Sequence, residues 1–306
     1  MVNTHISIDG MKSYNESYYD SYAAIYSLLA FETEQLKRHY PSSNIEKIDD
    51  YKTNILHKCA IFFHTLFYVV VEAHDYYSAG TLIRMIADTL SSYNLIYHDS
   101  DKETTCLRHY LFILDGLCQR KKYFDCHQMN YDNTISMEVY KRLELQVSSS
   151  KENTLNAIDI CKSQITKLDI YKAQKENVDM LIEKRNWQFI DVSRPKGHYK
   201  WEQLYPMLDN KKAFSDMITF LSQFVHGLSI SNLTIDNSLQ DFEPLLAYGI
   251  TLMSKTMAFI KNDFELSRND LFSGFLNSPH FSDYFSVSSE NKKDEILRRL
   301  RSMFSK

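Results

Sequence analysis

The sequence predicts an all-α protein, a multi-helix bundle of about nine to eleven helices, and three observations support this prediction. Only 7 glycines and 5 prolines occur in 306 residues, where average usage gives roughly 37 of the two together. Tight hairpins and phosphate-binding loops depend on these residues, so the composition argues against sandwiches, barrels and most nucleotide-binding folds. Hydrophobic residues make up 44% of the chain, enough for a packed core, and they recur at helical spacing.

The first half of the chain contains four long helical patterns. The first covers residues 11–39, between a glycine and a proline, and the second, over residues 44–76, is apolar on nearly every side, which indicates a central helix. In the third, residues 78–97, apolar side chains converge on one side with the 3.6-residue period. The fourth, residues 101–127, begins with acidic residues and ends near three basic ones, as the helix dipole favours.

The second half is predicted to be helical with more interruptions. A short helix covers about residues 136–145, the serines at 148–150 separate it from the next element, and a long amphipathic helix then continues to Trp187. The remaining predicted elements are helices over residues 210–227, 240–264 and 289–304, and short elements around Leu271 and Phe281.

We expect these helices to form a single domain over residues 1–306, in which residues 266–306 can be a C-terminal helical appendage.

The formal net charge is −4, which is too balanced for a protein that binds nucleic acid with its whole surface. A local basic patch remains compatible with this total.

The cysteines and the N-terminus predict a cytoplasmic protein. The 5 cysteines are an odd number and widely spaced, which fits a reducing compartment better than a disulfide framework. The N-terminal residues lack the basic and apolar regions of a secretory signal. The longest apolar run, from Cys59 to Val71, contains His64 and is shorter than the roughly 20 residues of a membrane-spanning helix. We therefore expect no membrane association.

One irregular segment, residues 188–200, interrupts the helical pattern. It carries Arg194 and Lys196 around a proline and a glycine, and the two tryptophans of the chain, Trp187 and Trp201, flank it. Such loops often carry function, so Arg194 and Lys196 are candidate ligand-binding residues. The alternative is a plain connection with solvated cations, anchored at its ends by the tryptophans.

No known catalytic or cofactor-binding motif is present. The sequence lacks a P-loop, a dinucleotide fingerprint, His-Glu-x-x-His, a nucleophile elbow and zinc-ribbon spacing. Cys118, Cys126 and His127 are too few and too far apart for a structural zinc site, which normally has four ligands. We therefore expect no metal and no cofactor. Whether the protein is an enzyme stays open, because catalytic groups can come together from distant positions.

Two short stretches carry a resemblance to a family. Residues 77–88 read Tyr-Ser-Ala-Gly-Thr-Leu-Ile-Arg-Met-Ile-Ala-Asp, and residues 220–227 read Phe-Leu-Ser-Gln-Phe-Val-His-Gly. They resemble an uncharacterised prokaryotic all-helical family in which a helix with Arg-x-x-x-acid and a later helix ending in Leu-Ser-x-x-Val-His-Gly recur. Asp88 stands where glutamate is usual in that family. The family has no assigned activity that the resemblance could transfer.

The resemblance implies a polar site between two helices, formed by Arg84, Asp88, Ser222 and His226. Each of these residues lies off the main apolar stripe of its helix, and a charge pair beside a histidine can form a polar pocket inside a bundle. In the alternative reading, Arg84 and Asp88 are an ordinary exposed pair worth tenths of a kcal/mol. His226 would then be a helix C-terminal residue favoured by the dipole.

These observations favour a binding or regulatory role for the protein. The alternative is a ribonuclease that resembles the helical HEPN type, or another nucleic-acid-processing defence protein; these ribonucleases place an arginine four to six residues before a histidine. Near His226 that arginine is missing, whereas Arg120 precedes His127 at a comparable spacing. RNA or a protein is a possible partner and a homo-oligomer a possible state, but the sequence identifies no ligand.

Overall fold

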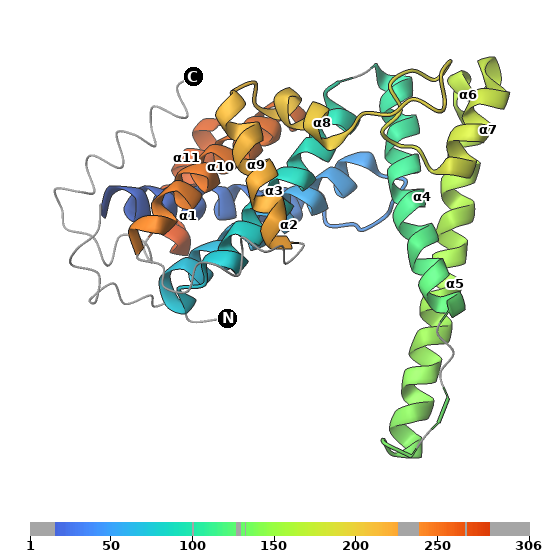
Figure 1. Ribbon diagram of the computed structural model, residues 1–306, viewed down its shortest axis with the longest axis horizontal. Coiled ribbons are helices and arrows are strands. Elements are labelled where there is room, and N and C mark those ends of the chain that lie inside the picture. The colour runs from blue at the N-terminus through green and yellow to red at the C-terminus, as the bar shows by residue number, and fades with distance from the viewer. Residues whose placement is uncertain are drawn as a thin grey trace. The chain divides into compact units, whose positions relative to one another are not determined.

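The computed structural model describes residues 16–99, 101–126, 130–131, 133–225, 239–266 and 268–281. Within these ranges the chain forms α-helices joined by short connections, and its β-structure is limited to an isolated bridge between Phe189 and His198 (Figure 1). The all-α prediction is therefore confirmed. The helical elements are α1 (Glu16–His39), α2 (Ile48–Tyr68), the π-helical turn η1 (Val69–Ala73), α3 (Tyr76–Tyr97), α4 (Lys102–Cys126), α5 (Met137–Lys167), α6 (Asp169–Ala173), α7 (Lys175–Lys184), α8 (Trp201–Leu208), α9 (Lys212–Val225), the 3-10 turn η3 (Leu239–Phe242), α10 (Glu243–Asp263) and α11 (Arg268–Leu276).

The chain divides into two compact units. The first takes its described residues from 1–43, 49–92 and 205–306, and the second consists of 44–48 and 93–204. Helix α3 contributes to both units, because the boundary falls after Ser92. The single domain expected from the sequence stays a prediction.

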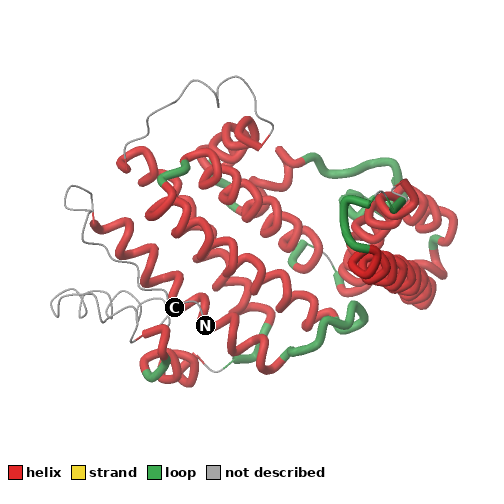
Figure 2. Tube along the Cα trace, turned by 90° about the horizontal axis from the view of Figure 1, so that it is seen from below, coloured by secondary structure: helices red, strands yellow, loops and turns green. Residues whose placement is uncertain are grey.

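The core of the first unit forms where α1, α2 and α10 meet around Tyr22. Its side chain is fully buried, its hydroxyl donates to the Phe63 carbonyl at 2.9 Å, and its ring stacks on Phe67 at 5.4 Å between centroids. On α10 the residue facing the ring is Gly249, where a Cβ would lie 2.6 Å from the Tyr22 Cε2 atom. The helices of this unit lie side by side in Figure 2.

Within the described part of the chain, α2 and η1 form the one continuous helix that is both long and apolar enough to be a candidate membrane span. By length and composition alone, Ile48–Ala73 could cross a membrane, with 44% of its most apolar window buried. It packs against α1 through the Tyr22 contacts and through Tyr26, whose ring lies 5.5 Å from that of His64. The core helix of a soluble protein passes the same test, so this finding is weak evidence for a membrane span.

The second unit contains α4 and α5, which lie side by side and are connected at one end (Figure 1). Their buried side chains include Leu111 and Leu114 on α4 and Ile158 and Ile165 on α5. The ammonium of Lys151, in the middle of α5, lies 2.9 Å from Asp125 Oδ1 at the C-terminal end of α4. The pair of helices therefore combines an apolar seam with an ion pair at the end of α4.

Two sequence predictions about this region are wrong. The serines at 148–150 lie inside the continuous helix α5 instead of ending a helix, since serine costs only tenths of a kcal/mol in a helix interior. The predicted long helix to Trp187 is instead divided, because Leu168 adopts an extended conformation after α5. The Glu103 carboxylate accepts hydrogen bonds from the Asp169 and Ile170 amides at 2.9 and 3.2 Å, which satisfies the exposed donors at the start of α6.

The other elements follow the predictions with local differences. Helix α8 was not predicted, although its residues Leu204, Tyr205 and Leu208 are buried. The segment after α7 is irregular as predicted. The predicted C-terminal helix over residues 289–304 lies outside the described residues.

Candidate functional site

The candidate site is a polar cluster of Arg84, Asp88 and Tyr205 in the first unit. Arg84 Nη1 lies 2.7 Å from Asp88 Oδ1, and the Tyr205 hydroxyl donates to the same carboxylate oxygen at 2.9 Å. The guanidinium carbon of Arg84 lies 4.9 Å from the centre of the Tyr205 ring, within the range of a cation–π contact. One carboxylate oxygen thus holds together two side chains that are far apart in the sequence.

The helical period explains how α3 presents the two charged residues. Ile83, Ile86 and Leu90 point into the core and are fully buried, whereas Arg84 and Asp88 stand one turn apart beside them. The Arg84 side chain is 13% exposed and that of Asp88 is 31% exposed. The pair is therefore half-buried, and the simple surface pair considered above does not describe it.

Tyr205 supplies the third member of the cluster from α8. Its side chain is 2% exposed, and a buried tyrosine hydroxyl needs a hydrogen-bond partner, which Asp88 provides. The sequence does not identify Tyr205 as a site residue, because a tyrosine on the apolar side of a short helix has no local feature that distinguishes it from a core residue. The bond joins residues separated by 117 positions.

The environment of Asp88 changes its acidity. Burial raises the pKa of the Asp88 carboxyl to about 6, although the nearby Arg84 guanidinium acts in the opposite direction. Burial penalises the charged carboxylate. Asp88 therefore changes its protonation near neutral pH, where it can accept or donate a hydrogen bond.

Helix α9 packs against the N-terminal part of α3, about two turns before Asp88. A Cβ on Gly80 would lie 2.7 Å from Phe224 Cδ2 and 3.0 Å from Leu221 Cδ2. Because Tyr205 contacts Asp88 while these later residues contact Gly80, the chain from α8 through α9 runs antiparallel to α3. Gly80 and Asp88 are separated by about 12 Å along the α3 axis.

The other residues expected at this site have different positions. Ser222 lies on α9 between Leu221 and Phe224, and its hydroxyl donates to the Thr219 carbonyl at 2.6 Å in its own helix. His226 lies outside the described residues, as does His127. Arg194 and Lys196 belong to the second unit. The structure thus brings together Arg84 and Asp88 of the expected set.

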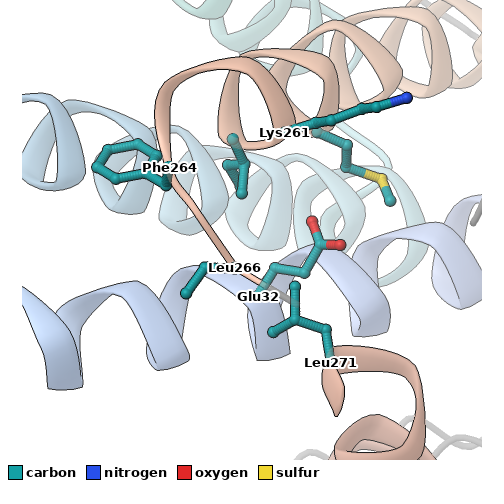
Figure 3. A pocket seen from close by; sticks show the side chains of 7 residues that line it. Glu32, Lys261, Phe264, Leu266 and Leu271 are labelled. Atoms are coloured by element: carbon teal, nitrogen blue, oxygen red, sulfur yellow. The ribbon is translucent and has the colours of Figure 1, made fainter. Parts of the chain in front are cut away.

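A small cavity lies elsewhere in the first unit, between α1, α10 and α11 (Figure 3). Its volume is about 20 Å³, and its lining residues are Glu32, Met257, Ile260, Lys261, Phe264, Leu266 and Leu271. This volume is enough for a water molecule. It is much smaller than the roughly 300 Å³ of a typical ligand pocket.

The described residues contain no group of three or more histidine, cysteine, aspartate or glutamate side chains that could hold a metal ion. The fold and the cluster define an all-α helical protein with a half-buried Arg-Asp-Tyr site. Comparison of the chain with models of protein families, with curated proteins and with solved structures finds no match.

Proposed function

We propose that the protein is a binding module whose first unit recognises a ligand or partner at the Arg84–Asp88–Tyr205 cluster. One observation carries the proposal: Arg84 and Tyr205 both contact Oδ1 of Asp88, while the side chain remains 31% exposed. The two contacts fix the carboxylate in one orientation. Such a preorganised group binds with a smaller loss of side-chain entropy.

The ligand group that fits this cluster is a neutral hydrogen-bond donor. Asp88 Oδ2 has no hydrogen bond among the described residues and can accept one from an amide or a hydroxyl group. Arg84 already balances the carboxylate charge, so a second cation gains little there. A regulatory role follows if occupancy of the cluster changes with pH, because the raised pKa of Asp88 lies close to neutrality.

Ligand-induced thermal stabilisation tests this proposal. Wild type and Asp88→Asn are screened at pH 7.5 against neutral primary amides, nucleobases and monosaccharides. Asp216→Asn is the matched control, because Asp216 forms an exposed i,i+4 pair with Lys212. A compound at 100 times its Kd stabilises the folded state by about 2.7 kcal/mol.

We expect at least one of these compounds to raise the melting temperature of wild type and Asp216→Asn, and to lose most of this effect with Asp88→Asn. The amide of asparagine replaces one carboxylate oxygen by a donor, so it cannot keep both contacts and still accept from the ligand. Equal stabilisation of all three proteins, or of none, contradicts the proposal.

A further inference from the structure

The irregular segment of the second unit is an ordered loop with a defined turn. The Arg194 carbonyl accepts from the Gly197 amide at 2.9 Å, which closes a β-turn with Pro195 and Lys196 at its central positions. Lys196 is not among the residues with positive φ, so the turn belongs to type I, in which proline at the second position and glycine at the fourth are favoured. The tip of the loop therefore has one preferred backbone conformation.

Side chains on the inner side of the loop fix its position in the second unit. The Asn186 amide donates to the Pro195 and Gly197 carbonyls at 3.0 and 3.2 Å. Arg108, only 3% exposed, donates to the Phe189 carbonyl at 3.0 Å and to the Leu95 carbonyl at 2.9 Å. Asn186 thus holds the turn of the loop, and Arg108 holds its beginning at Phe189.

The outer side of the loop carries positive charge. Arg194, Lys196 and Lys200 are exposed, and no salt bridge involves them within the described residues. Residues 188–200 contain three basic residues and one acidic residue, in a chain whose net charge is −4. The charge of this loop is therefore opposite to that of the whole protein.

The same loop also carries one exposed apolar side chain and two rings. Ile190 is 49% exposed, His198 is exposed and Tyr199 is half-buried, and both rings lie between Lys196 and Lys200 in the sequence. Cations that contact phosphates and rings that stack on bases are the combination used by proteins that bind single-stranded nucleic acid. An acidic peptide needs the cations but has no use for the rings.

We propose that the loop of residues 188–200 is a binding surface for single-stranded nucleic acid, in which Arg194, Lys196 and Lys200 contact backbone phosphates and Tyr199 contacts a base. This function is separate from ligand recognition at Asp88, because the loop and the Asp88 cluster belong to different units. The fixed turn lowers the entropy that binding costs, since the cations project from an ordered backbone.

Fluorescence anisotropy with a labelled 20-nucleotide oligo(U) tests this surface. The test variant is Arg194→Ala/Lys196→Ala/Lys200→Ala, and the matched control is Lys167→Ala/Lys172→Ala/Lys175→Ala, which removes the same charge from exposed positions of the same unit. We expect the test variant to weaken binding at least tenfold and the control to change it less than about twofold, since only the loop cations contact phosphates. Circular dichroism verifies that both variants are folded.

Two further measurements separate nucleic acid from other polyanions. Three phosphate contacts give a slope of roughly −2 for log K against log salt with a single strand, and the test variant is expected to bring this slope close to zero. Tyr199→Leu should weaken oligo(U) binding by several fold, as the loss of one stacked base predicts. Asp88→Asn should leave this binding unchanged.

The opposite results overturn the proposal. These are the absence of oligo(U) binding by wild type at 50 mM KCl, an equal loss of affinity in both triple variants, and displacement of oligo(U) by polyglutamate at the same concentration of negative charge. The last result would assign the loop to an acidic protein partner.

Discussion

At the scale of single residues, the fold changes the acidity of Asp88. Its carboxyl is held by Arg84 and Tyr205, and burial raises its pKa to about 6, whereas an aspartate in an unfolded chain has a pKa near 3.9. Between these two values the folded protein binds more protons than the unfolded chain. The contribution of Asp88 to stability is therefore complete below about pH 4 and is lost as the pH rises through about 6.

Asp88→Asn is expected to remove this part of the pH dependence. Two pKa units correspond to about 3 kcal/mol, and we reduce this to about 1 kcal/mol because solvent screens a carboxyl that is 31% exposed. Urea unfolding at pH 4 and pH 7 measures the difference. On going from pH 7 to pH 4, wild type should gain about 1 kcal/mol relative to Asp88→Asn.

Asp216→Asn is the control, since its carboxyl is 61% exposed in a pair with Lys212. This variant should keep the pH profile of wild type. If Asp88→Asn and wild type show parallel profiles, Asp88 is not buried as described.

The residue pairs that the sequence could predict are those set by local spacing. Arg84 and Asp88 stand four positions apart, so their contact follows from the helical repeat. Tyr205, by contrast, reaches Asp88 across 117 positions. In the same way Arg108 reaches the Phe189 carbonyl across 81 positions. Hydrophobic periodicity says which face of a helix is buried but not which helix lies opposite, so neither contact could be derived.

At the scale of elements, the scarcity of glycine correctly predicts helices. The prediction that the serines at 148–150 separate two helices is wrong. Ser148 to Ser150 remain helical within α5, whose later turns bury Ile158 and Ile165. The helix ends instead at Leu168. The Glu103 carboxylate of α4 accepts hydrogen bonds from the first two amides of the next helix, α6. Glu103 was expected to act on the dipole of its own helix, and its contact with α6 depends on the packing of α4.

Two helical glycines allow opposite predictions for the same substitution. In Gly249→Ala the new methyl group would lie 2.6 Å from Tyr22 Cε2, and Tyr22 is fixed by its bond to Phe63 and by burial. Overpacking costs about 1–3 kcal/mol, against a gain in helix propensity of up to about 1 kcal/mol. We expect a net loss of about 1–2 kcal/mol in the free energy of unfolding.

Gly116→Ala provides the matched comparison, because nothing lies within 4 Å of a Cβ at that position in α4. It should stabilise the protein by about 0.5–1 kcal/mol through helix propensity and lower entropy of the unfolded chain. Urea unfolding monitored by circular dichroism measures both variants. Equal effects of the two substitutions would show that the close approach of Tyr22 to α10 is absent.

At the scale of the whole molecule, the chain divides into two compact units, and whether they behave as the single domain that the sequence predicts stays a prediction. Periodicity cannot show this division, since α3 crosses the boundary without an interruption in its pattern. The positions of the tryptophans allow an experiment to distinguish one cooperative domain from two units that unfold independently. Trp187 and Trp201 are the two tryptophans of the chain, and both belong to the second unit, where their ring centroids lie 6.5 Å apart.

Tryptophan fluorescence therefore reports unfolding of the second unit, while far-ultraviolet circular dichroism reports the helices of both. Since Gly249 lies in the first unit, we expect Gly249→Ala to lower the melting temperature of that unit by roughly 2–4 °C per kcal/mol lost. The fluorescence midpoint should stay within error of the wild-type value, and Gly116→Ala should raise it, because Gly116 lies in the second unit. If Gly249→Ala shifts both signals by the same amount, the two units unfold as one cooperative domain, and the single domain predicted from the sequence is the correct description.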